Sequence, residues 1–378
     1  MRNLARPLLR MLGRDDRGAI GVLIAVLIGG GVLLGMAALV VDVGQIYQNR
    51  TELQNGADAG ALAAARQCAL GTCALASATS TALTYTNANA SALTGHAAGV
   101  TAVCGSDGLG DCSGVVGTGL TNCPPDPTNG LNFVDVLAST RLANGSTLLP
   151  PVFGRTLVGN GTYDGTTVKA CAQAEWGYAE QSNSLALTIS VCQWQDLIAS
   201  GGGFNTLVPV YIKGKAKACA GPAGLNIPGG FGWLNTTSPS SCTAKIDLTT
   251  DTTVTKTGNS VTSACQNALV ADVSSYVSGH PVTVFVPVFG CPNPPVPGCP
   301  VANTGSSATY YVIGLAGFVV SGYKSIPGLR PDAGTNSACT GNAPCLEGYF
   351  TPGLDPVSDY PSPTPGGGFS AKAIKLSG

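Results

Sequence analysis

Residues 53–65 read LQNGADAGALAAA, a segment with a single charge, at Asp58, and almost no bulky side chain. On an α-helix its smallest residues would form a smooth surface on which another backbone can lie close. These residues are Gly56, Ala57, Gly60, Ala61 and Ala64. The segment therefore predicts helix packing, against a neighbour that belongs either to this chain or to another.

This segment is the end of a longer helical pattern. No proline interrupts residues 42–67, and their apolar residues recur at helical spacing, at Val43, Ile46, Tyr47, Leu53, Ala57 and Ala61. The preceding residues 18–41, GAIGVLIAVLIGGGVLLGMAALVV, carry no charge. As a helix they would be about 36 Å long, enough to cross a hydrocarbon core of about 30 Å. We predict one rod of about 75 Å, from Gly18 to about Gln67.

The charges around the apolar run predict its orientation. Residues 1–17 contain five arginines, whereas Asp42 follows the run at once and marks the water boundary. The positive-inside rule places the N-terminus in the cytoplasm and residues 42–378 outside it. A cleaved signal peptide is the alternative, although the run is long for one. Gly31 and Gly35 form a G-x-x-x-G pair that would let two membrane helices approach and form a helix-mediated oligomer.

The composition also favours a location outside the cytoplasm. Charged residues make up only 10% of the 378 residues, against about a quarter in typical soluble domains. The formal net charge is −1, and the basic N-terminus leaves the remainder acidic. We therefore expect no nucleic-acid partner, because no basic face is available to neutralise phosphates.

The fourteen cysteines predict disulfides. A zinc site needs C-x-x-C spacing or histidine partners, and the chain has no such spacing and only two histidines. The candidates are Cys68, Cys73, Cys104, Cys112, Cys123, Cys171, Cys192, Cys219, Cys242, Cys265, Cys291, Cys299, Cys339 and Cys345. Four pairs are close in sequence, Cys68/Cys73, Cys104/Cys112, Cys291/Cys299 and Cys339/Cys345, but the connectivity cannot be read from the sequence.

The remaining residues predict an α+β protein, in which the long helix precedes a mainly β, disulfide-rich domain. Runs of β-branched and aromatic residues predict strands at 133–138, 167–174, 185–191, 207–212, 282–288 and 310–320, and a helix lies within 263–278. Residues 371–376, AKAIKL, predict a final edge strand whose lysines discourage further pairing. Residues 68–90 would prolong the rod or fray. The expected units are 1–17, 18–41, 42–90, 91–360 and 361–378, the last beginning with the linker PSPTPGGG.

The sequence shows little catalytic chemistry. It contains no nucleophile elbow, H-E-x-x-H motif, P-loop or dinucleotide-binding loop. We interpret His96 and His280 as loop residues and Trp176, Trp194 and Trp233 as core residues. The string Asp272-Val273-Ser274-Ser275-Tyr276 has Tyr where an Asp-x-Ser-x-Ser metal site needs its last Ser. We expect no enzyme, cofactor or metal.

The N-terminal fifty residues resemble the TadE/TadG-like proteins of the Flp (Tad) pilus-assembly system. The resemblance rests on Arg17-Gly18, Val41-Asp42-Val43-Gly44, Tyr47, Leu53-Gln54-Asn55, Ala57-Asp58-Ala59 and Ala61-Leu62-Ala63-Ala64-Ala65. More loosely, FGWLN (231–235), PVTVFVPVF (281–289) and AKAIKL resemble the Cys-containing ectodomains of actinobacterial members. Leu23 stands where processed pilins place Glu, which argues against prepilin-peptidase cleavage.

This resemblance implies a membrane-anchored, non-enzymatic component of a pilus assembly or surface-presentation system. Its partners would be the lipid bilayer and other pilus-assembly or envelope proteins. The expected packing residues are Gly31, Gly35, Asp42, Tyr47, Leu53, Ala57, Asp58 and Ala61. Leucine at Ala57 and Ala61 should then impair assembly and leave the ectodomain folded. The alternative is an anchored extracellular enzyme or ligand-binding protein unrelated to pili.

Overall fold

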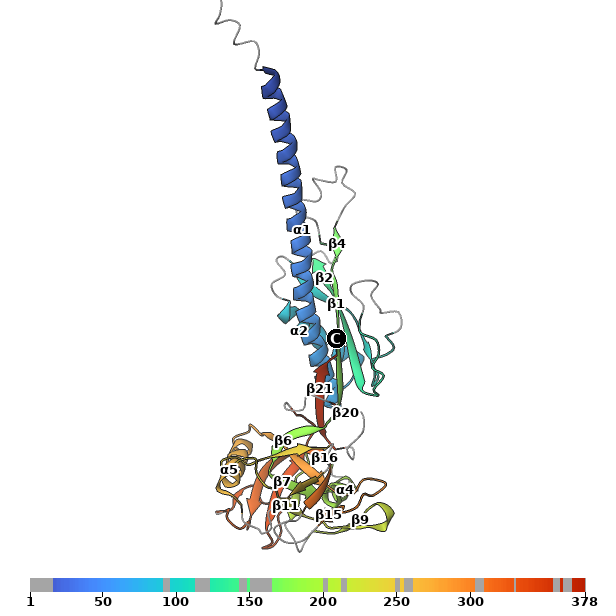
Figure 1. The fold of residues 1–378 in the computed structure, drawn as a ribbon. Coiled ribbons are helices and arrows are strands. Elements are labelled where there is room, and N and C mark those ends of the chain that lie inside the picture. Colours follow the sequence, from blue (N-terminus) through green and yellow to red (C-terminus); the bar gives the residue numbers. More distant parts are fainter. Residues whose placement is uncertain are drawn as a thin grey trace, which may run out of the picture.

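A long N-terminal helix leads into a body of two packed units (Figure 1). The computed structural model describes residues 16–90, 96–112, 123–142, 148–149, 165–199, 203–211, 216–248, 252–254, 261–302, 309–329, 331–355, 361–362 and 369–377. Helix α1 (Asp16–Ala69) is one element of 54 residues, which confirms the predicted rod. No proline and no charge cluster breaks its hydrogen-bond ladder.

After α1 the chain turns back on itself. Helix α2 (Leu75–Asn89) packs against α1, and the disulfide between Cys68 and Cys73 closes the turn between them. Gly71 adopts φ +85°, a left-handed conformation that glycine tolerates best. The expectation that residues 68–90 prolong the rod or fray is therefore wrong, because a left-handed glycine and a disulfide together reverse the chain.

The first unit is a helix layer on a mainly antiparallel sheet. The strands, in spatial order, are β1 (His96–Gly105), β2 (Asn132–Leu142), β5 (Lys169–Ala179), β21 (Ala371–Leu376) and β19 (Gly353–Leu354), and β20 (Pro361–Ser362) also pairs with β5. Alternate residues of β2 and β5 form a core with the alanines of α1 and α2; examples are Val134, Val136, Ala172, Ala174 and Trp176. Both helices thus cover the same face of this sheet.

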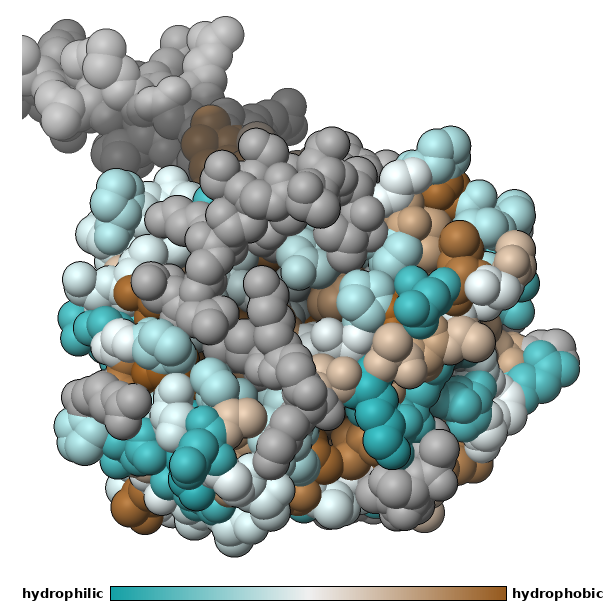
Figure 2. Space-filling model, turned by 90° about the horizontal axis from the view of Figure 1, so that it is seen from below, coloured by the Kyte–Doolittle hydropathy of each residue, from teal (hydrophilic) through white to brown (hydrophobic). Residues whose placement is uncertain are grey.

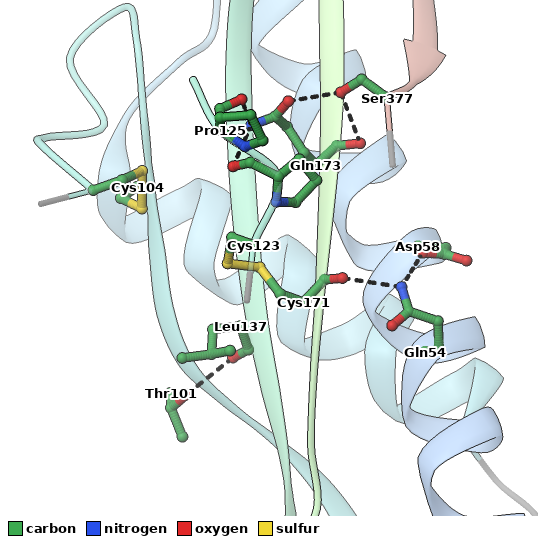
Figure 3. Close-up of a disulfide and its surroundings, with 12 residues drawn as sticks. Gln54, Asp58, Thr101, Cys104, Cys123, Pro125, Leu137, Cys171, Gln173 and Ser377 are labelled. Carbon is green, nitrogen blue, oxygen red and sulfur yellow. Dashed lines mark hydrogen bonds between the residues drawn. A yellow bond between two sulfur atoms is a disulfide. The ribbon is translucent and has the colours of Figure 1, made fainter. Parts of the chain in front are cut away.

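Loops cover part of the opposite face of this sheet. The register aligns Cys104, Asp135 and Gln173 across three neighbouring strands. Disulfides tie the covering loops to the sheet, from Cys104 to Cys112 and from Cys123 to Cys171 (Figure 3). Gln173 also donates from Nε2 to the carbonyls of Pro124 and Pro125, at 3.5 and 3.4 Å.

The last strand corrects one prediction. β21 pairs with β5 on one side and with β19 on the other, so it is not an edge strand. Its lysines make contacts within the fold: Lys375 Nζ lies 3.4 Å from Glu175 Oε2, and Lys372 Nζ lies 3.3 Å from the ring centre of Tyr178. Of the predicted linker 361–368, Pro361 and Ser362 form β20, and 363–368 lie outside the described residues.

The second unit is built around a larger sheet. Its main path is β11 (Phe231–Trp233), β7 (Leu187–Ser190), β14 (Thr283–Phe289), β16 (Thr309–Lys324), β18 (Cys345–Phe350) and β8 (Val208–Tyr211). Short strands β13 (Thr252–Val254), β15 (Val301–Ala302) and β17 (Ala333–Gly334) pair with β16. Helix α5 (Ser263–Val277) packs on β16. Strands β14 and β16 and helix α5 confirm the predicted elements.

Three two-stranded ribbons and two short helices complete the described elements. The ribbons are β6 (Gln181–Leu185) with β12 (Thr243–Asp247), β9 (Cys219–Ala220) with β10 (Asn226–Ile227), and β3 (Leu148–Leu149) with β4 (Thr166–Thr167). The helices are α4 (Val191–Ala199) and the 3₁₀ turn η2 (Pro222–Gly224). The predicted strand 185–191 is only partly right, because β6 ends at Leu185 and α4 begins at Val191.

All fourteen cysteines form disulfides. The four pairs that are close in sequence are bonded. The other three bonds are Cys123–Cys171, Cys192–Cys219 and Cys242–Cys265. Each unit is therefore cross-linked by several disulfides, as the cysteine content predicts.

Candidate assembly site on the N-terminal helix

The first part of α1 is an exposed apolar rod. Its large apolar side chains between Val22 and Val43 lie in the open, and Leu34 is 74% exposed. Figure 1 shows this part of α1 extending beyond the sheets. One helix in the described part of the chain, Gly21–Ala69, is long and apolar enough to cross a membrane. So large an exposed apolar surface requires a cover of lipid or of other helices.

The second part of α1 is buried in the chain's own first unit. Leu53, Ala57 and Ala61 are completely buried, and α1 packs against α2, β2, β5 and β21. This answers the question that the sequence left open, since the neighbour of these small residues belongs to the same chain. Leucine at Ala57 or Ala61 would therefore clash with this chain's own core, and the expectation that such variants leave the ectodomain folded is wrong.

Two glycines bring α1 and α2 into close contact. A Cβ at Gly60 would lie 2.5 Å from Thr86 Oγ1, and one at Gly56 would lie 2.8 Å from the Thr86 carbonyl oxygen. The facing residues of α2 and its C-cap repeat every four positions and are all small and buried: Ala78, Ala82, Thr86 and the C-cap Ala90. The G-x-x-x-G pair that joins helices within this chain is thus Gly56 with Gly60. A Cβ at Gly31, by contrast, would meet no atom within 4 Å outside the adjoining turns of α1.

The change from exposed to buried helix takes place over about two turns. Asp42 is partly exposed, Tyr47 is 66% exposed, and Asn49 is buried. At about 1.5 Å per residue, Asn49 lies only about 11 Å beyond Asp42 along the helix axis. The first unit therefore begins almost directly after the apolar run.

Two polar residues attach α1 to the sheet: Asp58, which was among the predicted packing residues, and Gln54, which was not. Gln54 donates from Nε2 to the Cys171 carbonyl at 3.0 Å and to Asp58 Oδ1 at 2.8 Å (Figure 3). β21 pairs with β5 only from Ala174 onwards, so the Cys171 carbonyl lies beyond the paired part of that edge. Gln54 thus satisfies a strand edge, and Asp58 positions the Gln54 amide. The helical period alone places Gln54 beside Asp58, but it does not reveal the strand that they serve.

Other candidate residues lie in the cores. Trp176, Trp194 and Trp233 are buried, as predicted. His96 opens β1 and is therefore not in a loop, and His280 follows α5 in a turn. The ligand atoms of Cys104, Cys112 and Asp135 lie within 4.8 Å of one another, but both sulfurs belong to one disulfide and offer no thiolate to a metal.

The far end of the second unit differs from the exposed part of α1. Figure 2 shows this end, and on its coloured part apolar side chains form small spots among polar ones. Single exposed apolar residues of this kind are normal on protein surfaces. Within the described residues, the continuous apolar surface lies on α1.

Comparison with known proteins gave a match for the N-terminal helix. Searches with the whole chain against curated protein sequences and against solved structures gave no match. The Tad family model, described as "Putative Flp pilus-assembly TadE/G-like", matches residues 18–67. These residues comprise nearly all of α1, including both its exposed and its buried part. Residues 18–67 thus form a TadE/G-like segment, which indicates involvement in Flp pilus assembly.

Proposed function

We propose that this chain is a non-enzymatic, single-span component of a Flp/Tad-type pilus assembly or surface-presentation system. The observation that carries the proposal is the division of α1 into an exposed apolar half and a half that is buried in the chain's own fold. The exposed half contacts lipid and the helices of other assembly proteins. The buried half holds the ectodomain at a fixed position relative to that contact.

The topology of the proposal rests on charge and redox chemistry. Five arginines precede the apolar run, which favours a cytoplasmic N-terminus. Seven disulfides lie beyond the apolar run, and disulfides persist in oxidising compartments. Both arguments support the proposal that the two units lie outside the cytoplasm. The non-enzymatic part of the proposal rests on the lack of catalytic motifs in the sequence.

The burial of residues 53–61 moves the expected contact with partner helices to the exposed half of α1. Because Leu53, Ala57 and Ala61 are covered by this chain, we expect partner helices to contact the exposed half. There Gly31 is exposed and Gly35 is partly exposed, and this small-residue pair allows close approach. Asp42 and Tyr47 lie at its outer end and would meet the membrane interface or a partner there.

The test compares two substitutions that add equal volume to the exposed half. Outside the adjoining turns of α1, neither Gly31 nor Gly21 has an atom within 4 Å of an added Cβ, so we expect leucine at either position to leave the fold intact. We expect Gly31→Leu to reduce co-purification of pilus components at least tenfold, and Gly21→Leu to leave it unchanged. The melting temperature of the ectodomain should stay the same in both. Undiminished co-purification with the Gly31→Leu variant would contradict assembly through this face.

A further inference from the structure

A cleft of about 900 Å³ lies between the two units, and we call it the junction cleft. It is formed by the end of α1, the ribbon of β6 and β12, helix α5, the start of β14, and the strands β19 and β21. Its apolar lining includes Leu70, Leu185, Phe285, Leu354 and Ile374. This volume is in the range of small-molecule sites, which are common at the junction of two units.

Three charged side chains line the junction cleft: Arg66, Asp272 and Asp355. Asp272 is half-buried on α5, and burial raises the pKa of its carboxyl to about 6. Within the described part of the chain, its side chain makes no hydrogen bond or ion pair. Asp355 is buried, whereas Arg66 is exposed to solvent. The cleft thus combines apolar walls with an excess of one negative charge.

A bound cation would offset the unfavourable burial of the Asp272 carboxylate. A partly desolvated carboxylate without a counter-charge is unfavourable, and an opposite charge within hydrogen-bond distance stabilises its ionised form. We propose that the junction cleft binds a guanidinium or ammonium group carried on an apolar chain. Asp272 pairs with the cation, and Leu185, Phe285 and Ile374 contact the apolar part. The group comes either from an arginine or lysine of another protein or from a free organic amine.

Guanidinium compounds are suitable probes because guanidinium is weakly hydrated and forms bidentate pairs with carboxylates. We would titrate the full chain in lipid nanodiscs with butylguanidinium and with its neutral analogue butylurea, using calorimetry. We expect binding of butylguanidinium and at least tenfold weaker binding of butylurea. Asp272→Asn should weaken butylguanidinium binding at least tenfold. Asp196→Asn, which changes an exposed carboxylate on α4, should leave it unchanged. Binding should also weaken between pH 7.5 and pH 5, as Asp272 becomes protonated.

A second measurement covers the case in which Asp272→Asn alters the fold. In the unmodified chain, saturating butylguanidinium should slow carbodiimide labelling of Asp272 and leave that of Asp196 unchanged. Equal affinity for butylguanidinium and butylurea, or unslowed labelling of Asp272, would overturn the proposal. Tighter binding of acetyl-Leu-Arg-Leu-amide than of butylguanidinium would identify the source as a protein segment, and the reverse would identify a free amine. No pilus component is needed, so failure here leaves the proposed function untouched.

Discussion

At the scale of single residues, the absence of side chains fixes the distance between α1 and α2. Gly56 and Gly60 face the backbone of α2, and Ala82 and Thr86 supply small partners. Close helix contact of this kind gains dispersion energy along both backbones. It also leaves no room for one more methyl group.

This close contact predicts opposite effects for two glycine-to-alanine changes in the same helix. At Gly60 a Cβ would lie 2.5 Å from Thr86 Oγ1 and 3.0 Å from the Ala82 carbonyl oxygen. We expect Gly60→Ala to lower the free energy of unfolding of the ectodomain by about 1–3 kcal/mol, the usual cost of overpacking. Gly44 has open space around it, so Gly44→Ala should leave stability unchanged or raise it slightly. Denaturant unfolding would measure the free energy of unfolding of both variants. Equal changes in the two variants would contradict the close helix contact at Gly60.

Asp135 makes the stability of the first unit depend on pH. Burial raises the pKa of its carboxyl to about 6; a hydrogen bond with Gln173 lowers the pKa, and the charge of Asp126 raises it. In the unfolded chain the pKa of an aspartate is about 3.9. Between about pH 4 and pH 6 the folded chain therefore binds this proton more tightly than the unfolded chain, and stability falls as the pH rises through that window.

We expect the Asp135 carboxyl to add about 1 kcal/mol to the free energy of unfolding when the pH is lowered from 7.5 to 5. Asp135→Asn should remove this gain, because the amide does not titrate. The measurement is denaturant unfolding of both proteins at the two pH values, since their difference cancels the other carboxylates. An identical pH dependence of the two proteins would show that Asp135 is not strained by burial.

At the scale of elements, disulfides replace apolar packing where loops are rich in glycine and proline. Cys68–Cys73 closes a turn between two helices that also pack directly, and its residues are 5 apart in sequence. Cys123–Cys171 spans 48 residues and holds a loop over the sheet. The longer closure restricts the unfolded chain more strongly.

Removing these two bonds should therefore have unequal effects. Loop-closure entropy predicts that replacing both Cys123 and Cys171 by Ala costs about 2 kcal/mol more than replacing both Cys68 and Cys73. Unfolding in guanidinium chloride, followed by circular dichroism, would measure the difference. A larger loss from the helix turn would mean that native-state contacts of Cys68 dominate.

The elements that the sequence predicts are those whose signal is local. α1, α5, β14 and β16 are long, periodic or rich in β-branched residues, and their existence follows from that pattern. β1 reads HAAGVTAVCG, and its small residues become a strand only through pairing with β2. The placement of β21 between two strands likewise depends on partners distant in sequence, β19 among them.

The candidate assembly site could be predicted in part for the same reason. Helical spacing shows that residues 53–65 have a small-residue face, but it does not name the surface that covers this face. Only the fold shows that the cover is α2, β2 and β5. The preceding half, by contrast, was predicted from its uncharged run of 24 residues to be long enough to span a membrane, and α1 contains such a helix.

At the scale of the whole molecule, the described residues form two hydrophobic cores. One contains α1, α2 and strands of the first sheet, and the other is centred on β14, β16 and β18. β21 joins them, because Ala371 and Ala373 belong to the second core and Ile374 packs on the first. The junction cleft lies at this connection, where a bound cation would contact both units.

Because α1 is one continuous helix, a tilt of its apolar half also moves the folded units that are packed on its other half. No hinge separates the exposed half from the half buried in the first unit, because both belong to one helix. The part of α1 beyond Val41 is about 42 Å long at roughly 1.5 Å per residue. A membrane-helix tilt of about 20°, the average for such helices, would therefore move the end of α1 sideways by about 14 Å. A small change in the tilt of the apolar half of α1 would thus produce a large displacement of the two folded units.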